Sequence, residues 1–152
     1  KGSFETSKDG MDIAICSVDI KKKKLWFSGA NNPLFLIRKS NEEYELIERK
    51  GDNMPVGFYS LMDSFTCHEI DIQEGDTIYL FSDGFLDQFG GHDGKKFMKS
   101  RFIQMILDNQ YLDMDSQKHA FNKTLDEWIN YPLGSCTIFN QVDDILLLGI
   151  RI

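Results

Sequence analysis

The sequence lacks the features of several large protein classes. It has only three cysteines, Cys16, Cys67 and Cys136, and no CxxC pair. An odd, scattered set argues against a disulfide framework, so we expect reduced thiols, a cytoplasmic protein, and buried side chains for Cys16 and Cys67, which fall in strand-like runs. No apolar run approaches the roughly 20 residues that a membrane-spanning helix needs, and no signal peptide is visible. We therefore expect no membrane contact by this segment.

Positive charge is also scarce. Lys and Arg number 17 against 24 Asp and Glu, which gives a formal net charge of −7. This balance argues against a nucleic-acid partner, which usually requires a basic surface. The one basic cluster, Lys21–Lys24, is short and is predicted to be a solvated hairpin turn. With 41% hydrophobic residues in 152, the chain should fold rather than stay disordered, and we treat residues 1–152 as one domain.

Strand-like alternation of apolar and polar residues dominates the first part of the chain. Turn-forming Gly, Asn and Pro residues separate the alternating runs and favour hairpin connections between them. The expected strands are Met11–Ile20, the two halves of Leu25–Arg38 on either side of a turn at 29–33, Glu43–Arg49, Ser64–Ile72 and Thr77–Phe81.

The pattern then changes to helical spacing. Apolar residues recur with helical period from Lys95 to Leu107 and again from Ser116 to Ile129. A loop is expected over Tyr131–Gln141, and the final apolar run, Val142–Ile152, is predicted to be a central strand. Antiparallel strands, two helices and one last strand indicate an α+β fold.

Acidic residues stand at the ends of two of these apolar strands. Asp83 and Gly84 follow Thr77–Phe81, and Asp143 and Asp144 begin the final strand. Such acids can converge at one edge of a sheet, where Mg²⁺ or Mn²⁺ would accept carboxylate oxygens and retained water. Histidine is scarce and the cysteines are unpaired, which disfavours zinc. Taken alone, a strand-end aspartate is more often a turn or capping residue.

A series of motifs strengthens the metal interpretation. They are, in order, DGMDIA, GANNPL, MPVG, GDTIYLFSDGFLDQFGG and QVDDILLLGI. Together they resemble the second half of a PPM-type (protein phosphatase 2C-like) metal-dependent serine/threonine phosphatase domain of the bacterial SpoIIE-like (sporulation stage II E) branch. The resemblance covers the chain from about Asp9 to Ile152. It implies an antiparallel β-sandwich with helices on its outer faces, metal ligands at Asp83 and Asp143, and a further, weaker metal position at Asp87.

One part of the family pattern is missing. The first half of such domains carries a D-x-x-G-H-G-like motif, and the only Gly-His pair here, Gly91-His92, lies on the wrong side of the Ser-Asp-Gly motif. A smaller departure is GANNP, where many relatives have AGHNP. We therefore expect that the N-terminal part of the family domain is absent, that this fragment is inactive, and that its open strand edges favour a homo-oligomer. A natural half-domain is the alternative explanation.

The resemblance implies a reaction and a setting. The complete domain would use two Mn²⁺ or Mg²⁺ ions to hydrolyse phosphoserine or phosphothreonine on a regulatory protein of a bacterial signalling pathway, often an anti-sigma-factor antagonist, downstream of a sensory domain. No catalytic residue beyond the metal ligands is predicted, and the cysteines lack the Cys-x5-Arg context of a thiol phosphatase. The alternative is a non-catalytic regulatory or dimerising half-domain, or a pseudophosphatase that binds a partner protein.

Overall fold

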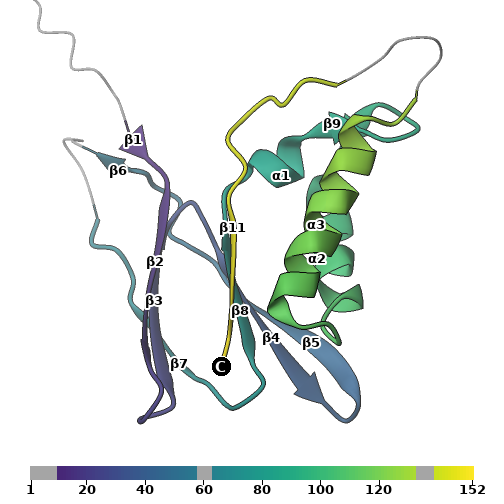
Figure 1. Cartoon of the computed structure of the whole chain (residues 1–152). Coiled ribbons are helices and arrows are strands. Elements are labelled where there is room, and N and C mark those ends of the chain that lie inside the picture. Colours follow the sequence, from purple (N-terminus) through teal and green to yellow (C-terminus); the bar gives the residue numbers. More distant parts are fainter. Residues whose placement is uncertain (1–9, 58–62, 133–138) are drawn as a thin grey trace, which may run out of the picture.

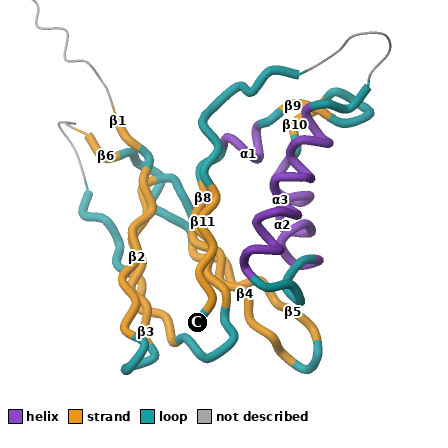
Figure 2. The backbone as a smooth tube through the Cα atoms, viewed as in Figure 1, coloured by secondary structure: helices purple, strands orange, loops and turns teal. Residues whose placement is uncertain are grey.

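The computed structural model describes residues 10–57, 63–132 and 139–152, so Cys136 lies outside the described residues. The chain is arranged in three layers, a three-stranded sheet, a four-stranded sheet and a layer of helices, with the four-stranded sheet in the middle (Figures 1 and 2). The two stacked sheets and the helices that cover one of them form the predicted α+β sandwich.

The middle sheet is antiparallel throughout, with strand order β11-β8-β4-β5. Its strands are β4 (Leu34–Ser40), β5 (Glu43–Arg49), β8 (Thr77–Phe81) and β11 (Leu147–Arg151). The inner strands β4 and β8 are buried along most of their length. The first four residues of β4 and most of β8 are apolar, because these parts have one face against the helices and the other against the second sheet.

The outer sheet has strand order β2-β3-β7 and is also antiparallel. Its strands are β2 (Ile13–Asp19), β3 (Lys24–Ala30) and β7 (His68–Asp71). Two separate two-stranded ribbons pair β1 (Gly10–Met11) with β6 (Val56–Gly57), and β9 (Phe89–Gly90) with β10 (Lys95–Lys96). The pairing of Asp19 with Lys24 closes the β2–β3 hairpin over the lysine turn, as predicted.

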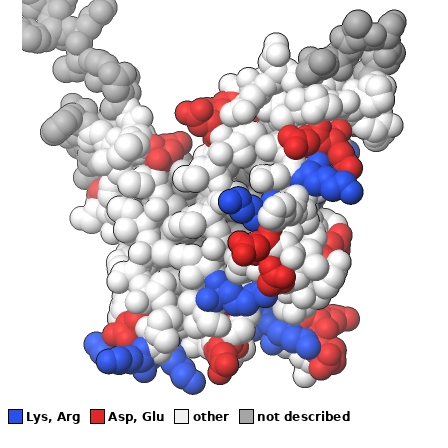
Figure 3. Space-filling view, viewed as in Figure 1, with Lys and Arg blue, Asp and Glu red and all other residues white. Residues whose placement is uncertain are grey.

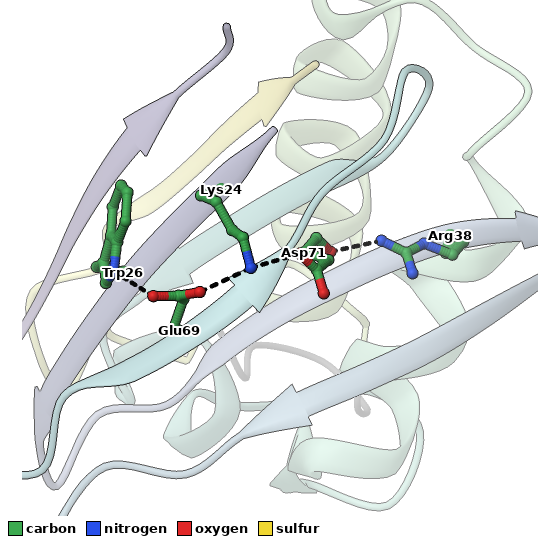
Figure 4. A network of polar contacts seen from close by, with 5 residues as sticks. All are labelled: Lys24, Trp26, Arg38, Glu69 and Asp71. Atoms are coloured by element: carbon green, nitrogen blue, oxygen red, sulfur yellow. Dashed lines mark hydrogen bonds and ion pairs between the residues drawn. The ribbon is translucent and has the colours of Figure 1, made fainter. Parts of the chain in front are cut away.

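A chain of polar contacts crosses one end of the sandwich (Figure 4). The Lys24 ammonium lies 2.6 Å from the Glu69 carboxylate and 2.7 Å from that of Asp71, and it lowers the pKa of both carboxyls. Trp26 Nε1 donates to Glu69 at 3.1 Å. Arg38 Nη2, from the middle sheet, donates to the Asp71 carbonyl oxygen at 2.9 Å. These contacts connect β3 and β7 to each other and to β4.

The helices lie on the outer face of the middle sheet (Figure 1). They are α1 (Gly84–Asp87), α2 (Met98–Asp108) and α3 (Met114–Ile129). Asp113 caps α3, because its carboxylate accepts a hydrogen bond from Ser116 N at 2.8 Å. None of the helices in the described ranges combines the length and the apolar character needed to cross a membrane.

Alternation along the inner strands divides the apolar side chains into two clusters. On β4, Phe35 and Ile37 face the helices, whereas Leu34 and Leu36 face the outer sheet. The helix-side cluster is completed by Tyr79, Phe81, Phe85, Phe97, Phe102, Met105, Ile106 and Phe121, and the sheet-side cluster by Leu25, Phe27, Ile70, Ile72 and Ile78. The middle sheet therefore contributes side chains to both clusters.

The prediction of a central strand over Val142–Ile152 was wrong. Strand β11 begins only at Leu147 and is an edge strand of the described sheet. Leu148 and Ile150 are exposed by 48% and 38%. Leu148 pairs with Leu80 and so shares its face, but the outer sheet does not cover it. An apolar run indicates that a strand can be buried on both faces, and it does not show what covers those faces.

The predicted strand Ser64–Ile72 is shorter than expected, and Cys67 is exposed rather than buried. Before β7, the backbone bonds to side chains instead of a neighbouring strand. Thr66 N and Oγ1 donate to the Asp52 carboxylate at 2.7 and 2.9 Å, and Ser28 Oγ donates to the Thr66 carbonyl oxygen at 2.8 Å. Because these bonds satisfy the main chain of Thr66, the ladder begins only at His68.

Candidate metal-binding site

The end of β8 and the start of β11 meet at one edge of the middle sheet. Ser82 continues the pairing beyond β8, because its backbone N donates to the Leu146 carbonyl oxygen at 3.0 Å. The Ser82 hydroxyl donates to the Asp144 carbonyl oxygen at 2.8 Å and accepts from Leu146 N at 2.9 Å. Asp83 follows Ser82 and Asp143 precedes Asp144. The predicted meeting of the two strand ends is thus confirmed.

Gly84 allows the two segments to approach this closely. A Cβ atom built on Gly84 would lie 2.4 Å from the Asp144 carbonyl oxygen and 2.9 Å from the Asp144 carbonyl carbon. Both atoms belong to the backbone and cannot rotate away as the end of a flexible side chain could. The glycine of the Ser-Asp-Gly motif is therefore explained by a close contact between α1 and the segment ahead of β11.

Asp83 and Asp143 both expose their carboxylates. Asp83 stands directly before α1 but makes no side-chain capping hydrogen bond to it. Asp143 Oδ1 accepts a hydrogen bond from Asp144 N at 2.7 Å, and the rest of its side chain is open to solvent. The capping role that a strand-end aspartate often has does not account for Asp83.

Asp87, the third predicted ligand, ends α1 and is paired with a lysine. Its Oδ2 lies 2.9 Å from Lys96 Nζ on β10, and both side chains are about half exposed. Asp87 and Asp143 line the same hollow of about 240 Å³, together with Lys96, Phe89 and Val142. The second and third predicted ligands thus share one hollow, with an ammonium group beside them.

The three acids have the donor atoms that a hard divalent cation prefers, but they do not gather into a complete set of ligands. Their carboxylate oxygens are the donors that Mg²⁺ and Mn²⁺ prefer, and such ions keep several waters in their coordination shell. Within residues 10–57, 63–132 and 139–152, no group of three or more His, Cys, Asp or Glu side chains gathers closely enough to hold a metal ion. The assignment of Asp83, Asp143 and Asp87 as ligands stays a prediction.

Two residues of this edge were not singled out from the sequence. The Ser82 hydroxyl joins the two segments, and a serine directly ahead of Asp-Gly is a signal that could have suggested such a bond. Lys96 offers no local signal, because only the β9–β10 ribbon brings it to Asp87.

The surface around the helices carries both signs of charge. On the face shown in Figure 3, acidic and basic side chains lie next to one another, and its described residues form no broad basic area. The expectation that no nucleic acid binds this chain stays a prediction.

Comparison with known proteins identifies similar folds. The family model of Stage II sporulation protein E (SpoIIE) matches residues 4–152. The solved SiaA-PP2C domain of Pseudomonas aeruginosa is similar with a TM-score of 0.76 and 33% sequence identity, over 93% of this chain and 51% of that chain. A comparison with curated proteins found no match.

Two structures from Bacillus subtilis share the fold alone, since their identities are low. The phosphatase domain of the cell fate determinant SpoIIE, presoaked with Mn, has a TM-score of 0.59 and 14% identity over 93% of this chain and 56% of that chain. The PP2C phosphatase domain with a fragment of the regulatory domain has a TM-score of 0.61 and 16% identity, over 93% of this chain and 37% of that chain. The chain spans about half the length, or less, of the solved structures it matches.

Proposed function

Since the chain belongs to the SpoIIE family, as its motifs predicted, we propose that it forms the second half of a metal-dependent phosphatase domain that dephosphorylates serine or threonine on a protein. The structural neighbours are PP2C phosphatase domains, which supports a phosphatase-type function. The chain spans 51% of the SiaA-PP2C domain, so the remaining parts of the site would come from outside it.

The observation that carries this proposal is the convergence of two acidic strand ends. Asp83 and Asp143 are far apart in sequence, yet the bonds of Ser82 hold their segments together at one edge of the sheet. Both residues are exposed, and Asp83 makes no side-chain capping bond to α1. Their carboxylate oxygens are therefore available to a cation at this edge.

In this proposal Asp83 and Asp143 hold Mn²⁺ or Mg²⁺, and Asp87 contributes to a further, weaker position. A divalent cation there would supply a Lewis acid for the phosphoryl oxygens and ease the deprotonation of a coordinated water. The chain's own residues fix the geometry: Ser82 holds the Asp144 backbone, Gly84 permits the close approach, and Lys96 offsets the charge of Asp87. The Mn presoak of the Bacillus subtilis phosphatase domain supports manganese as the ion to test first.

The substrate and the setting are carried over from the family resemblance. We propose a phosphorylated regulatory protein as substrate, with an anti-sigma-factor antagonist as the first candidate, and a sensory domain upstream of the phosphatase domain. A cytoplasmic location belongs to the same proposal. The net charge of −7 makes a direct role on nucleic acid the weaker expectation.

A second candidate function is a non-catalytic half-domain that binds a protein partner. The edge strand β11 favours it, because Leu146 and Leu148 are exposed by 65% and 48% beside an edge that pairs with no strand in the described sheet. A binding module would hold its partner whether or not metal is present, whereas the phosphatase requires Mn²⁺ or Mg²⁺ for turnover.

The first prediction tests the phosphatase proposal through Asp83→Asn in the full-length protein. We expect the change to abolish Mn²⁺-dependent hydrolysis of a phosphoserine peptide, since one metal ligand is lost. The free energy of unfolding without metal should change by less than about 0.5 kcal/mol, because Asp83 is exposed and caps nothing with its side chain. Phosphate release and thermal melting measure the two effects.

Asp126→Asn, at an exposed acid of α3, is the matched control and should leave both measurements unchanged. Retained activity together with a melting temperature lowered by many degrees would identify Asp83 as a structural turn residue. Such a result would remove the basis of the proposed function.

A further inference from the structure

The buried side chain of Gln88 is bonded to the segment that leads to Asp143. Gln88 follows Asp87 at the end of α1 and is 0% exposed. Its Nε2 donates to the carbonyl oxygens of Asn140 and Phe89, both at 3.0 Å. Its Oε1 accepts a longer hydrogen bond, of 3.4 Å, from Val142 N. The amide therefore uses both of its N–H groups and its oxygen.

The backbone of Gln88 is itself held firmly by the helix layer. Its carbonyl oxygen accepts from Phe97 N at 2.9 Å and from Trp128 Nε1 at 3.0 Å. The Phe97 and Trp128 rings pack edge to face with centroids 5.2 Å apart. The backbone of Gln88 is thus bonded to the start of α2 and the end of α3, and its side chain is bonded to the segment of Asn140 and Val142.

Asp143 is the single residue between two such tethers. On one side, Val142 N is held by Gln88, and on the other, the Asp144 carbonyl oxygen is held by Ser82. Ser82 precedes α1 by two positions and Gln88 follows it directly, so both tethers originate next to this short helix. Asp143 has little freedom to move away from α1.

We propose that Gln88 is a positioning residue that sets where Asp143 lies relative to Asp83 and Asp87. The inference rests on the proposed function of this edge as a metal site, and it adds a residue that the sequence motifs do not assign. Glutamine suits the role because one side chain supplies two donors and one acceptor to backbone groups of the same segment. Groups that orient metal ligands typically change metal affinity or activity by about 10- to 100-fold when they are removed.

The test compares Gln88→Met and Gln88→Glu with wild type in the full-length protein. Methionine keeps the length and removes every hydrogen bond, while glutamate keeps an acceptor for Val142 N and loses both donors. Two quantities are measured: the affinity for Mn²⁺ alone, by electron paramagnetic resonance titration, and the hydrogen exchange of the Val142 amide without metal. The second measurement reports the tether and does not depend on the proposed function.

Gln110→Met is the matched control. Gln110 is likewise buried, at 2% exposure, and its Nε2 donates to Tyr79 OH at 2.7 Å and to the Ile106 carbonyl oxygen at 2.9 Å, within a different network. We expect all three variants to lose stability. Only the Gln88 variants should show faster Val142 exchange and Mn²⁺ affinity weakened by about 10- to 100-fold.

Three results would overturn the inference, and they are distinguishable. Unchanged Val142 exchange in a folded Gln88 variant would show that the side chain holds nothing. Faster exchange with Mn²⁺ affinity equal to that of Gln110→Met would show that the tether has no effect on the metal site. A wild-type protein that binds no Mn²⁺ would remove the proposed function itself and the positioning role with it.

Discussion

At the scale of single residues, the candidate site depends on how small side chains let two backbone segments touch. Ser82 joins both segments with a hydroxyl that donates and accepts, and Gly84 leaves room for the Asp144 carbonyl oxygen. These two residues flank Asp83 in the sequence, so their contacts with the segment ahead of β11 hold Asp83 at the edge of the sheet. The Ser-Asp-Gly sequence is thus explained by packing on both sides of the acid, and the acid itself remains exposed.

Gly84→Ala should destabilise the protein and displace the segment ahead of β11. The added Cβ would stand 2.4 Å from a backbone oxygen, so either α1 or residues 143–144 must shift. Overpacking of this kind costs about 1–3 kcal/mol. Urea unfolding measures the loss, and Ser82→Ala is the comparison, with an expected loss of about 1 kcal/mol for a broken hydrogen-bond pair. An unchanged free energy for Gly84→Ala would mean that the two segments separate freely.

At the scale of elements, one ion pair fixes the turn before β8 against β4. Arg38 Nε and Nη2 donate to the two carboxylate oxygens of Asp76 at 2.9 and 2.6 Å, and Gln73 N donates to Asp76 Oδ2 at 2.9 Å. Asp76 is 1% exposed, and its hydrogen bonds to Arg38 raise the pKa of that guanidinium. Asp76 directly precedes β8, so this pair connects the start of that strand to β4.

Asp76→Asn should therefore cost about 3 kcal/mol of folding free energy, since it leaves the partly buried guanidinium of Arg38 without its carboxylate. Chemical denaturation measures the loss. The matched control is Asp71→Asn, whose side chain is 82% exposed and touches Lys24 at the surface, and it should lose much less. Equal losses in the two variants would show that burial of the Arg38–Asp76 pair adds nothing to the free energy of unfolding.

At the scale of the whole molecule, exposed apolar side chains lie along one edge of the described middle sheet. Strand β11 is an edge of the described middle sheet, and Leu146, Leu148 and Ile150 are exposed by 65%, 48% and 38%. An unpaired edge invites pairing with another strand, and contiguous exposed apolar residues mark an interaction surface.

We expect the 152-residue chain alone to self-associate and to be essentially inactive towards phosphoserine peptide. Size-exclusion chromatography with light scattering measures association, and a phosphopeptide assay in Mn²⁺ measures activity. Leu148→Lys should reduce association, because it places a charge beside the free edge of β11. Tyr111→Lys, at a residue 76% exposed beyond the end of α2, is the control and should change nothing. A strictly monomeric chain with turnover would contradict both parts.

The sequence by itself determined the local elements and the family. The apolar patterns of Leu25–Arg38, Glu43–Arg49 and Thr77–Phe81 predicted strands of the sandwich, because a strand covered on one face alternates and a strand covered on both faces is a short apolar run. The order of the Ser-Asp-Gly and terminal Asp-Asp motifs predicted the SpoIIE family, which the family match to residues 4–152 confirms. The same resemblance predicted that Asp83 and Asp143 belong to one edge, and the pairing of β8 with β11 brings the two strand ends together.

Only the tertiary structure decided which residues surround that edge. Gln88 and Ser82 bond to segments that are 52 and 62 positions away, and the sequence does not say which segments those are. Lys96 reaches Asp87 only because β9 pairs with β10. The same reason explains why the position of β11 was predicted wrongly, and why Cys67 is exposed. An apolar run specifies that a strand can be covered. What covers it depends on the pairing of distant segments, which is fixed only when the chain has folded.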